Sequence, residues 1–180
     1  ALNIVTADPA EKVGEVGQGT NPGFQYEYRL LRTDVPFDLN SHVDAAMIFG
    51  ANVPAEVFDI MEDGVAQVVN WNGTAADVGN QPGDIALPGG DADDQAIRVR
   101  GYAEFPAAGM YAMFVNSDDG FEAGIGSQQV MTAGNKGDSD VPVFVIIAEP
   151  GLYPIEVTWY ERGGGNNFEF VQWTDTGAPL

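Results

Sequence analysis

The feature that most restricts the fold of this chain is an alternation of apolar and polar residues with a period of two. The alternation is clear in Phe24–Leu30, Ile97–Phe105 and Tyr153–Trp159. Successive side chains of a β-strand point to opposite faces of its sheet, so this period is typical of strands with one buried face. Val141–Ala148 is almost continuously apolar, which predicts a strand buried on both faces.

The rest of the chain adds weaker strand patterns and one short helix pattern. Ala45–Phe49 and Ala66–Trp71 are the weaker strand candidates, whereas Pro54–Asp63 predicts a short helix with proline in its first turn. Glycine and proline lie between the strand patterns, as turns require, and Val78–Asp94 is predicted to be one long loop or a loosely held edge. Many short strands with few helices predict a β-sandwich or a β-barrel.

The length of the chain, 180 residues, suits one domain with a substantial core, and no linker divides it. Residues 1–22 differ from the rest, because an apolar stretch is followed by a polar, glycine-rich one. We expect an N-terminal strand and a flexible spacer there, and a single β-domain over residues 23–180. The terminal strand either pairs within its own sheet, the commoner arrangement, or adds to the edge of a neighbouring subunit.

The charge of the chain limits its partners. Asp and Glu number 27 against 7 Lys and Arg, which gives a formal net charge of -20. Such a chain repels phosphate backbones and anionic lipids, so we expect no nucleic-acid partner. No apolar run approaches the roughly 20 residues that span a bilayer, so we expect no membrane insertion. The acidity favours cation binding, with solubility alone as the alternative.

The residues for common catalytic sites are scarce. The absence of cysteine excludes disulfides, thiolate catalysis and cysteine metal sites. His42 is the single histidine, so no polyhistidine site can form, and a surface or capping role is expected for it. We therefore expect a non-enzyme, while a glycosidase with a carboxylate pair stays open. A start at Ala1 is what signal cleavage leaves, so secretion is expected, although a trimmed chain would begin alike.

The turn Asn116–Gly120 (NSDDG) is the strongest candidate site. Adjacent carboxylates repel, and a shared cation would compensate Asp118 and Asp119. Calcium takes six to eight oxygen ligands, which these carboxylates and the amides of a second loop could supply. The alternative is an ordinary hairpin, because Asp-Gly is a strong two-residue turn signal.

Other candidate residues carry weaker signals. The acidic runs 89–94 and 137–140 lack the later ligands of a helix–loop–helix calcium site and are expected to be solvated loops; whether 91–94 and 138–140 bind ions stays open. Trp71 is expected to be exposed, with its ring available for sugar stacking, and Trp159 to lie in the core. Asn72–Thr74 also forms a glycosylation acceptor sequence.

Several short motifs follow one another in the second half of the chain: Gly109-Met110-Tyr111, Ser117-Asp118-Asp119-Gly120, Gly151-Leu152-Tyr153-Pro154-Ile155, Tyr160-Glu161, and Phe168, Phe170 and Trp173 of a closing strand. In the order and spacing of these motifs, from about Arg98 to Trp173, the chain resembles the protective-antigen fourteen-kilodalton (PA14) domain family. The chain departs from the family in two ways. Phe121–Ile125 lacks the second Asp-Gly of many members, and the first hundred residues show no match.

This resemblance implies an antiparallel β-sandwich with long loops and at most short helices. The family occurs in bacterial toxins, glycosidases, fungal adhesins and surface proteins. In its adhesin members the Asp-Asp pair, joined by a cis peptide, binds calcium that coordinates sugar hydroxyls. Carried over, Asp118 and Asp119 match the metal-binding pair, and the second calcium loop corresponds to Gly163–Asn167, where Asn166 or Asn167 would supply an amide oxygen. The ligand-binding candidates are Asn116, Gly164 and Gly165 near these loops, and Trp71, which is proposed from its expected exposure.

The implied function is a secreted or cell-surface, calcium-dependent carbohydrate-binding and adhesion module. Its cofactor would be calcium and its partner a glycan, on a polysaccharide or a glycoprotein. The alternative is a structural subunit of an extracellular filament or surface layer, self-associating by donation of its N-terminal strand. Deletion of Ala1–Thr6 would then abolish assembly, because open head-to-tail contacts keep growing.

Overall fold

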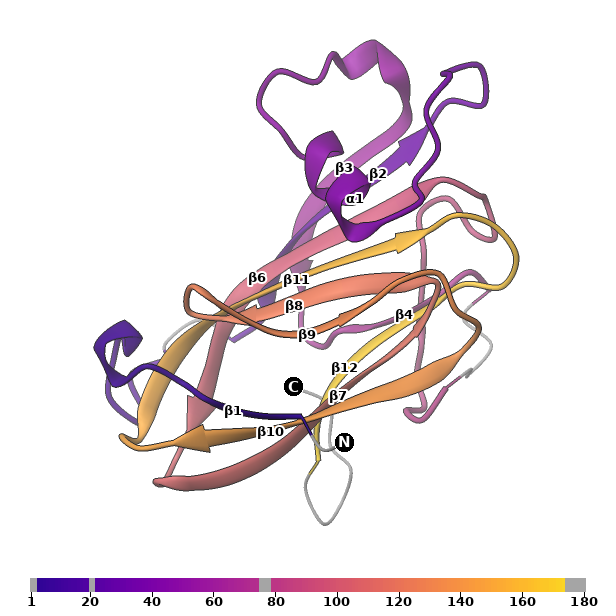
Figure 1. Ribbon diagram of the computed structural model, residues 1–180. Helices are drawn as coiled ribbons and strands as arrows, with labels where there is room; N and C mark the ends of the chain where they lie inside the picture. Colours follow the sequence, from indigo (N-terminus) through magenta and orange to yellow (C-terminus); the bar gives the residue numbers. More distant parts are fainter. Residues whose placement is uncertain (1–2, 20–21, 75–78, 174–180) are drawn as a thin grey trace.

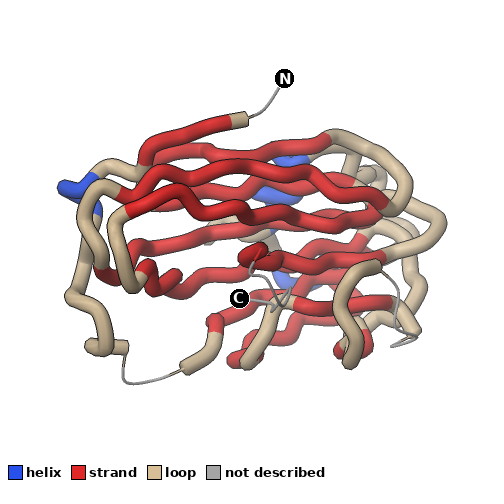
Figure 2. Tube along the Cα trace, turned by 90° about the horizontal axis from the view of Figure 1, so that it is seen from below, coloured by secondary structure: helices blue, strands red, loops and turns tan. Residues whose placement is uncertain are grey.

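The computed structural model describes residues 3–19, 22–74 and 79–173, which form two layers of β-structure (Figure 1, Figure 2). Within these residues each layer is a sheet of six strands. The first sheet has the order β1 (Ile4–Thr6), β10 (Ser139–Ile147), β7 (Gly109–Asp118), β12 (Asn167–Trp173), β4 (Asn70–Asn72), β5 (Ile85–Ala86). The second has the order β3 (Phe58–Ala66), β2 (Phe24–Leu31), β6 (Gln95–Phe105), β11 (Gly151–Glu161), β8 (Gly120–Ile125), β9 (Gln128–Ala133).

Strand pairing confirms the predicted fold class, a largely antiparallel β-sandwich. Among the described strands, β1 runs parallel to β10 and β4 parallel to β5, and the other pairs are antiparallel. The alternation of the sequence turns one side of each long strand into the space between the sheets. On β11 the inward side chains are all buried: Tyr153, Ile155, Val157 and Trp159. Trp159 therefore lies in the core, as predicted, and stacks on Phe168.

The segment between β2 and β3 forms a second, smaller core on the outer face of the second sheet. This segment contains α1 (His42–Ile48) and the short 3₁₀ turn η2 (Ala55–Val57). A second 3₁₀ turn, η1 (Pro9–Glu11), lies elsewhere, near the N-terminus. The buried members of this core include Leu31, Leu39, Ala45, Ile48, Phe49, Phe58, Ala96 and Tyr160. Figure 1 shows the segment at the top of the view, on the side of β2 and β3.

Three sequence predictions are wrong in this region. Ala45–Phe49 was predicted as a strand but lies mostly in α1, where the Ser41 hydroxyl caps the helix by accepting a bond from the Asp44 amide, 3.2 Å away. Pro54–Asp63 was predicted as a helix, but only η2 is helical and β3 follows it. Ala66–Trp71 was predicted as one strand, but its ends belong to β3 and β4, in different sheets. Short apolar runs do not distinguish helix from strand, and pairing partners decide between them.

β10 is not buried on both faces, contrary to the prediction from its apolar run. Its inward residues Val143 and Val145 are fully buried, whereas Ile146 on the other face is 38% exposed. The strand lies second from the edge of its sheet, so its outward side chains face away from the core. The predicted loop Val78–Asp94 is mostly irregular and contains the short β5; Val78 itself lies outside the described residues.

The N-terminal segment packs on its own domain. β1 pairs with β10 of the same chain, which agrees with the interpretation of an ordinary first strand. The Val13 amide donates to the carbonyl of Leu152, and the Leu152 amide donates to the carbonyl of Gly14, both at 2.9 Å. The part of the expected spacer that the structure describes is thus held against β11. Across all the residues that the structure describes, no helix is long and apolar enough to cross a membrane.

Candidate functional site

Two segments that change sheets meet at one end of the sandwich. β7 of the first sheet ends at Asp118 and β8 of the second begins at Gly120, so the Asp-Asp turn joins different sheets and is not the alternative hairpin. Residues 162–166 return the chain from β11 to β12 (Figure 1). Strand register places Asn167 opposite Asp118. The peptide bond between Asp118 and Asp119 is cis, as the family resemblance implied.

Asp119 is held by backbone amides from two loops. It is 8% exposed; one carboxylate oxygen accepts a bond from the Lys136 amide at 3.2 Å and the other from the Arg162 amide at 3.0 Å. Its carbonyl accepts a bond from the Ser117 hydroxyl at 2.9 Å. The preceding carbonyl, of Asp118, accepts from the Trp159 indole at 3.1 Å. The core thus fixes the backbone of the turn and leaves the Asp118 carboxylate partly exposed.

Glu161, at the end of β11, completes a group of acidic side chains. Among the described residues, Asp118, Asp119 and Glu161 each offer an oxygen, and these atoms lie within 4.8 Å of one another. Burial, together with the charges of Asp119 and Asp118, raises the pKa of Glu161 to about 8. Burial and the charge of Asp119 also raise the pKa of Asp118. Ionised together, these groups repel, and a bound cation reverses that repulsion.

Several buried oxygens at this site have no hydrogen-bond partner. Within the described residues, the oxygens without a partner here are both carboxylate oxygens of Glu161 and the amide oxygen of Asn167. The Gly163 amide faces Glu161 and slightly opposes the rise of its pKa, but it makes no bond of ordinary geometry. A buried acceptor without a donor costs about 1–3 kcal/mol. These oxygens therefore suit an occupant that takes lone pairs, as a metal ion does.

The amide of Asn167 is oriented by its neighbours. Its nitrogen donates to the Asn116 amide oxygen and, at 3.3 Å, to Asp138, which turns its own oxygen away from both. The Asn116 nitrogen donates to Asp140 at 2.7 Å. Asn116 was predicted to bind ligand, but both its polar atoms have protein partners, so it positions Asn167. The loop 138–140 likewise serves here as a support.

The remaining predicted residues divide into those near the carboxylates and those directed elsewhere. A Cβ atom on Gly165 would lie 3.3 Å from an Asp118 oxygen, so the glycine leaves that carboxylate open. Gly164 has φ +116°, a conformation that favours glycine in this loop. Asn166 turns its side chain toward Gly73 and Gly90, and its nitrogen donates to the Gly90 carbonyl at 3.1 Å. Asn167, and not Asn166, thus lies beside Asp118.

Trp71 is not a sugar-stacking residue, contrary to the prediction. It is 2% exposed and stacks on Phe168, with ring centroids 5.9 Å apart, inside the core. Its neighbour Asn72 is 5% exposed and its amide donates to the Asn166 carbonyl, so the glycosylation acceptor sequence is inaccessible. His42 begins α1 at the surface, 3.3 Å from a Glu122 oxygen.

Sequence reasoning missed two residues of the site. Glu161 was part of the Tyr160–Glu161 pair but was given no role, although a charged residue ending a strongly alternating strand is a usable signal. Lys136 donates from its ammonium to the carbonyls of Ser117 and, at 2.8 Å, Ser139, and burial lowers its pKa. It follows no alternating pattern, so nothing in the sequence marks it.

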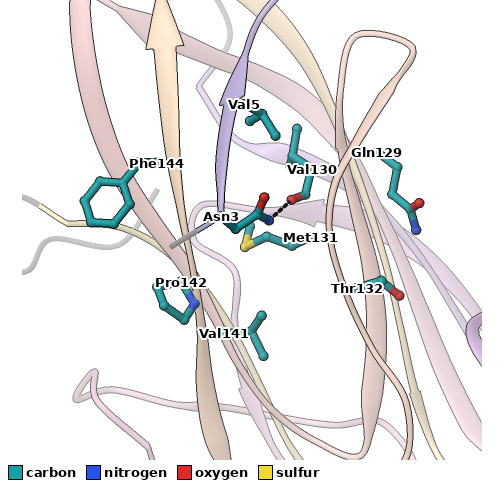
Figure 3. A pocket seen from close by; sticks show the side chains of 9 residues that line it. All are labelled: Asn3, Val5, Gln129, Val130, Met131, Thr132, Val141, Pro142 and Phe144. Atoms are coloured by element: carbon teal, nitrogen blue, oxygen red, sulfur yellow. Dashed lines mark hydrogen bonds between the residues drawn. The ribbon is translucent and has the colours of Figure 1, made fainter. Parts of the chain in front are cut away.

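A separate groove of about 460 Å³ opens between the edges of the two sheets, beside β1, β9 and β10 (Figure 3). The Asn3 amide crosses it and donates to the Val130 carbonyl at 2.6 Å. The described residues that line it carry no charge, so it offers no carboxylate to a cation: Asn3, Val5, Gln129, Val130, Met131, Thr132, Val141, Pro142 and Phe144.

No protein-family model and no curated protein sequence matches the chain. The chain is, however, similar to several solved structures. The PA14 domain of the MpAFP antifreeze protein is 23% identical with a TM-score of 0.62, covering 87% of this chain and 84% of that one. A PA14 sugar-binding domain from an RTX adhesin is 17% identical, with a TM-score of 0.63 over 88% and 93% of the two chains. The A domain of Epithelial Adhesin 9 from Candida glabrata, in complex with Galβ1-4GlcNAc, is 15% identical, with a TM-score of 0.59 over 93% and 90%.

Proposed function

Given that the chain has a PA14-like fold, we propose that it is an extracellular or cell-surface module that binds carbohydrate through a calcium ion. The ion would be held by Asp118, Asp119 and Glu161, with the Asn167 amide oxygen beside them. The observation that carries this proposal is the convergence of three carboxylate oxygens within 4.8 Å, where buried oxygens of Glu161 and Asn167 have no other described partner.

The donor set favours calcium over other metals. Zinc prefers nitrogen and sulfur ligands, and the site offers carboxylates and amides. Magnesium requires a near-ideal octahedron at about 2.0–2.1 Å and usually keeps several waters. Calcium accepts six to eight oxygens in flexible geometry, and solvent or ligand hydroxyls can complete its shell.

Two features support a sugar as the ligand on this ion. The glycine loop 163–165 places no side chains beside Asp118, so a ligand can approach that carboxylate. The structural neighbours include a sugar-binding domain and an adhesin domain in complex with a galactoside. The net charge of -20 disfavours phosphorylated ligands, so neutral glycans are expected.

The two alternatives have less support. A glycosidase needs two carboxyl groups that reach the scissile bond, whereas Glu161 is 0% exposed, and Asp119 is 8% exposed and accepts bonds from two backbone amides. A filament built by strand donation needs a free N-terminal strand, and Ile4–Thr6 is paired with β10.

The test compares melting temperature and glycan binding in calcium and in chelator. Calcium in about 100-fold excess over its Kd should stabilise the fold by about 2.7 kcal/mol, or roughly 5–10 °C. Asp118→Ala should abolish that shift and the retention on immobilised Galβ1-4GlcNAc or other neutral glycans. Asp59→Asn, an exposed carboxylate on β3, is the matched control and should behave as wild type. Equal melting in calcium and chelator would contradict the proposal.

A further inference from the structure

A second pair of oxygens converges beside Gly73, and one of them belongs to the 162–166 loop. Asn166 is 4% exposed, and its amide oxygen is buried without a hydrogen-bond partner in the described chain. The Asp91 carboxylate reaches the same place from the loop before β6. One oxygen from each side chain occupies the space that a Cβ atom on Gly73 would fill. Two acceptors therefore lie close together, and none of the described residues donates to the Asn166 oxygen.

Turning the Asn166 amide over does not resolve this conflict. Its nitrogen now donates to the Gly90 carbonyl at 3.1 Å, and in the reversed amide an oxygen would face that carbonyl. The neighbouring polar groups are also committed. The Asn72 nitrogen donates to the Asn166 carbonyl at 3.0 Å, and the Asn72 oxygen accepts from the Thr74 amide and hydroxyl. An acceptor faces an acceptor in either orientation.

We propose that Asp91 and Asn166 hold a second divalent cation, calcium. The Asp91 oxygen lies 1.9 Å and the Asn166 oxygen 2.3 Å from the position that a Cβ atom on Gly73 would take, so their separation is below the roughly 5 Å that two ligands of one calcium can span. Asp91 is exposed, so water can complete the coordination on that side. A sugar hydroxyl is a poorer occupant, because the Asn166 oxygen has almost no surface open to solvent.

This ion would be separate from the first. Asp91 is not among the carboxylates whose oxygens group at the Asp-Asp turn. With one carboxylate and one amide from the protein, its Kd should fall in the weak range of extracellular calcium modules, about 10⁻⁴–10⁻³ M. It would fasten the acidic loop 89–94 to the loop that leads into Asn167.

The experiment is a calcium titration of the full chain by isothermal calorimetry in 150 mM salt, where nonspecific surface binding is screened. Wild type should bind two ions. Asp91→Asn, which offers the Asn166 oxygen a donor, should keep the fold and bind one. Asp91→Ala, which removes the oxygen without a replacement, should also bind one. Asp59→Asn should bind two.

The outcomes separate this inference from the proposed function. If both Asp91 variants bind as many ions as wild type, the second site does not exist. A single wild-type ion that Asp118→Ala removes also overturns the inference and leaves the proposed function standing. A single ion that Asp91→Asn removes, and that Asp118→Ala spares, supports this site and overturns the calcium site at the turn.

Discussion

At the scale of single residues, Glu161 shows how burial gives an acidic side chain a role. Its position ends β11 where the chain leaves the second sheet, so its carboxylate enters a space already occupied by Asp118 and Asp119. An isolated buried carboxylate with no donor is unfavourable unless it is protonated or paired with a cation. In the proposed site, Glu161 would therefore be either protonated or bound to the ion.

We predict that Glu161→Gln leaves the calcium-free fold almost unchanged and removes most of the calcium response. In ion-free protein the pKa of Glu161 is raised to about 8, chiefly by burial, so near pH 7 the side chain is mainly neutral, like glutamine. The measurement is melting temperature with and without calcium. Asp59→Asn is again the control. A full calcium shift in the Gln variant would show that Glu161 does not contact the ion.

The same residues predict a pH dependence. Because the pKa of Glu161, like that of Asp118, is raised in the folded state, the ion-free protein holds protons that the unfolded chain releases at lower pH. Its free energy of unfolding should therefore fall as pH rises from about 4.5 toward about 8.

Calcium binds the ionised form, so the melting-temperature difference between calcium-loaded and calcium-free protein should grow across pH 5 to 8. The difference is the correct readout, because the raised pKa of Glu169, about 7 through burial, affects both samples. A difference that stays constant, or shrinks with pH, would contradict this assignment.

At the scale of elements, β4 shows how a three-residue strand is held. Trp71 points inward between Tyr26 and Phe168, with centroid separations of 5.5 and 5.9 Å. Asn70 and Asn72 on either side are buried on the opposite face. Trp71→Ala should therefore destabilise the fold by about 3–5 kcal/mol. Chemical denaturation measures this. If the free energy of unfolding changed by less than about 1 kcal/mol and glycan binding were lost, Trp71 would stack on sugar after all, contrary to its burial.

The sequence predicted the long strands and could not predict where they turn. Over much of their length β2, β6 and β11 turn one face to the main core and the other outward, so their alternation is visible in the chain. α1 was mistaken for a strand because seven residues show little period, although Ser41 and Asp44 form a readable cap. The grouping of Glu161 with Asp118 depends on two sheet changes, and periodicity within a strand carries no information about them. Asp118, Asp119 and Asn167 were found through the family resemblance, whose turn and glycine loop the structure brings together.

At the scale of the whole molecule, charge is unevenly arranged. Arg98 and Arg100 both contact Glu27 on the outer face of the second sheet, and Arg100 also contacts Glu156 at 2.6 Å. These pairs take up part of the small set of basic residues. The end with the Asp-Asp turn keeps an excess of carboxylates, and such a field raises the local concentration of cations.

The meeting of the two sheet-changing segments has a mechanical consequence. An ion bound by Asp118, Asp119 and Glu161 would connect the end of β7 to the end of β11, and so would link the two sheets. Shear between the layers would then have to break metal–oxygen bonds. We expect the force that unfolds a tethered molecule to rise with calcium, and optical-tweezer traces with equal rupture forces in chelator would refute this. A surface protein of this construction would resist mechanical unfolding best where the surrounding water is rich in calcium.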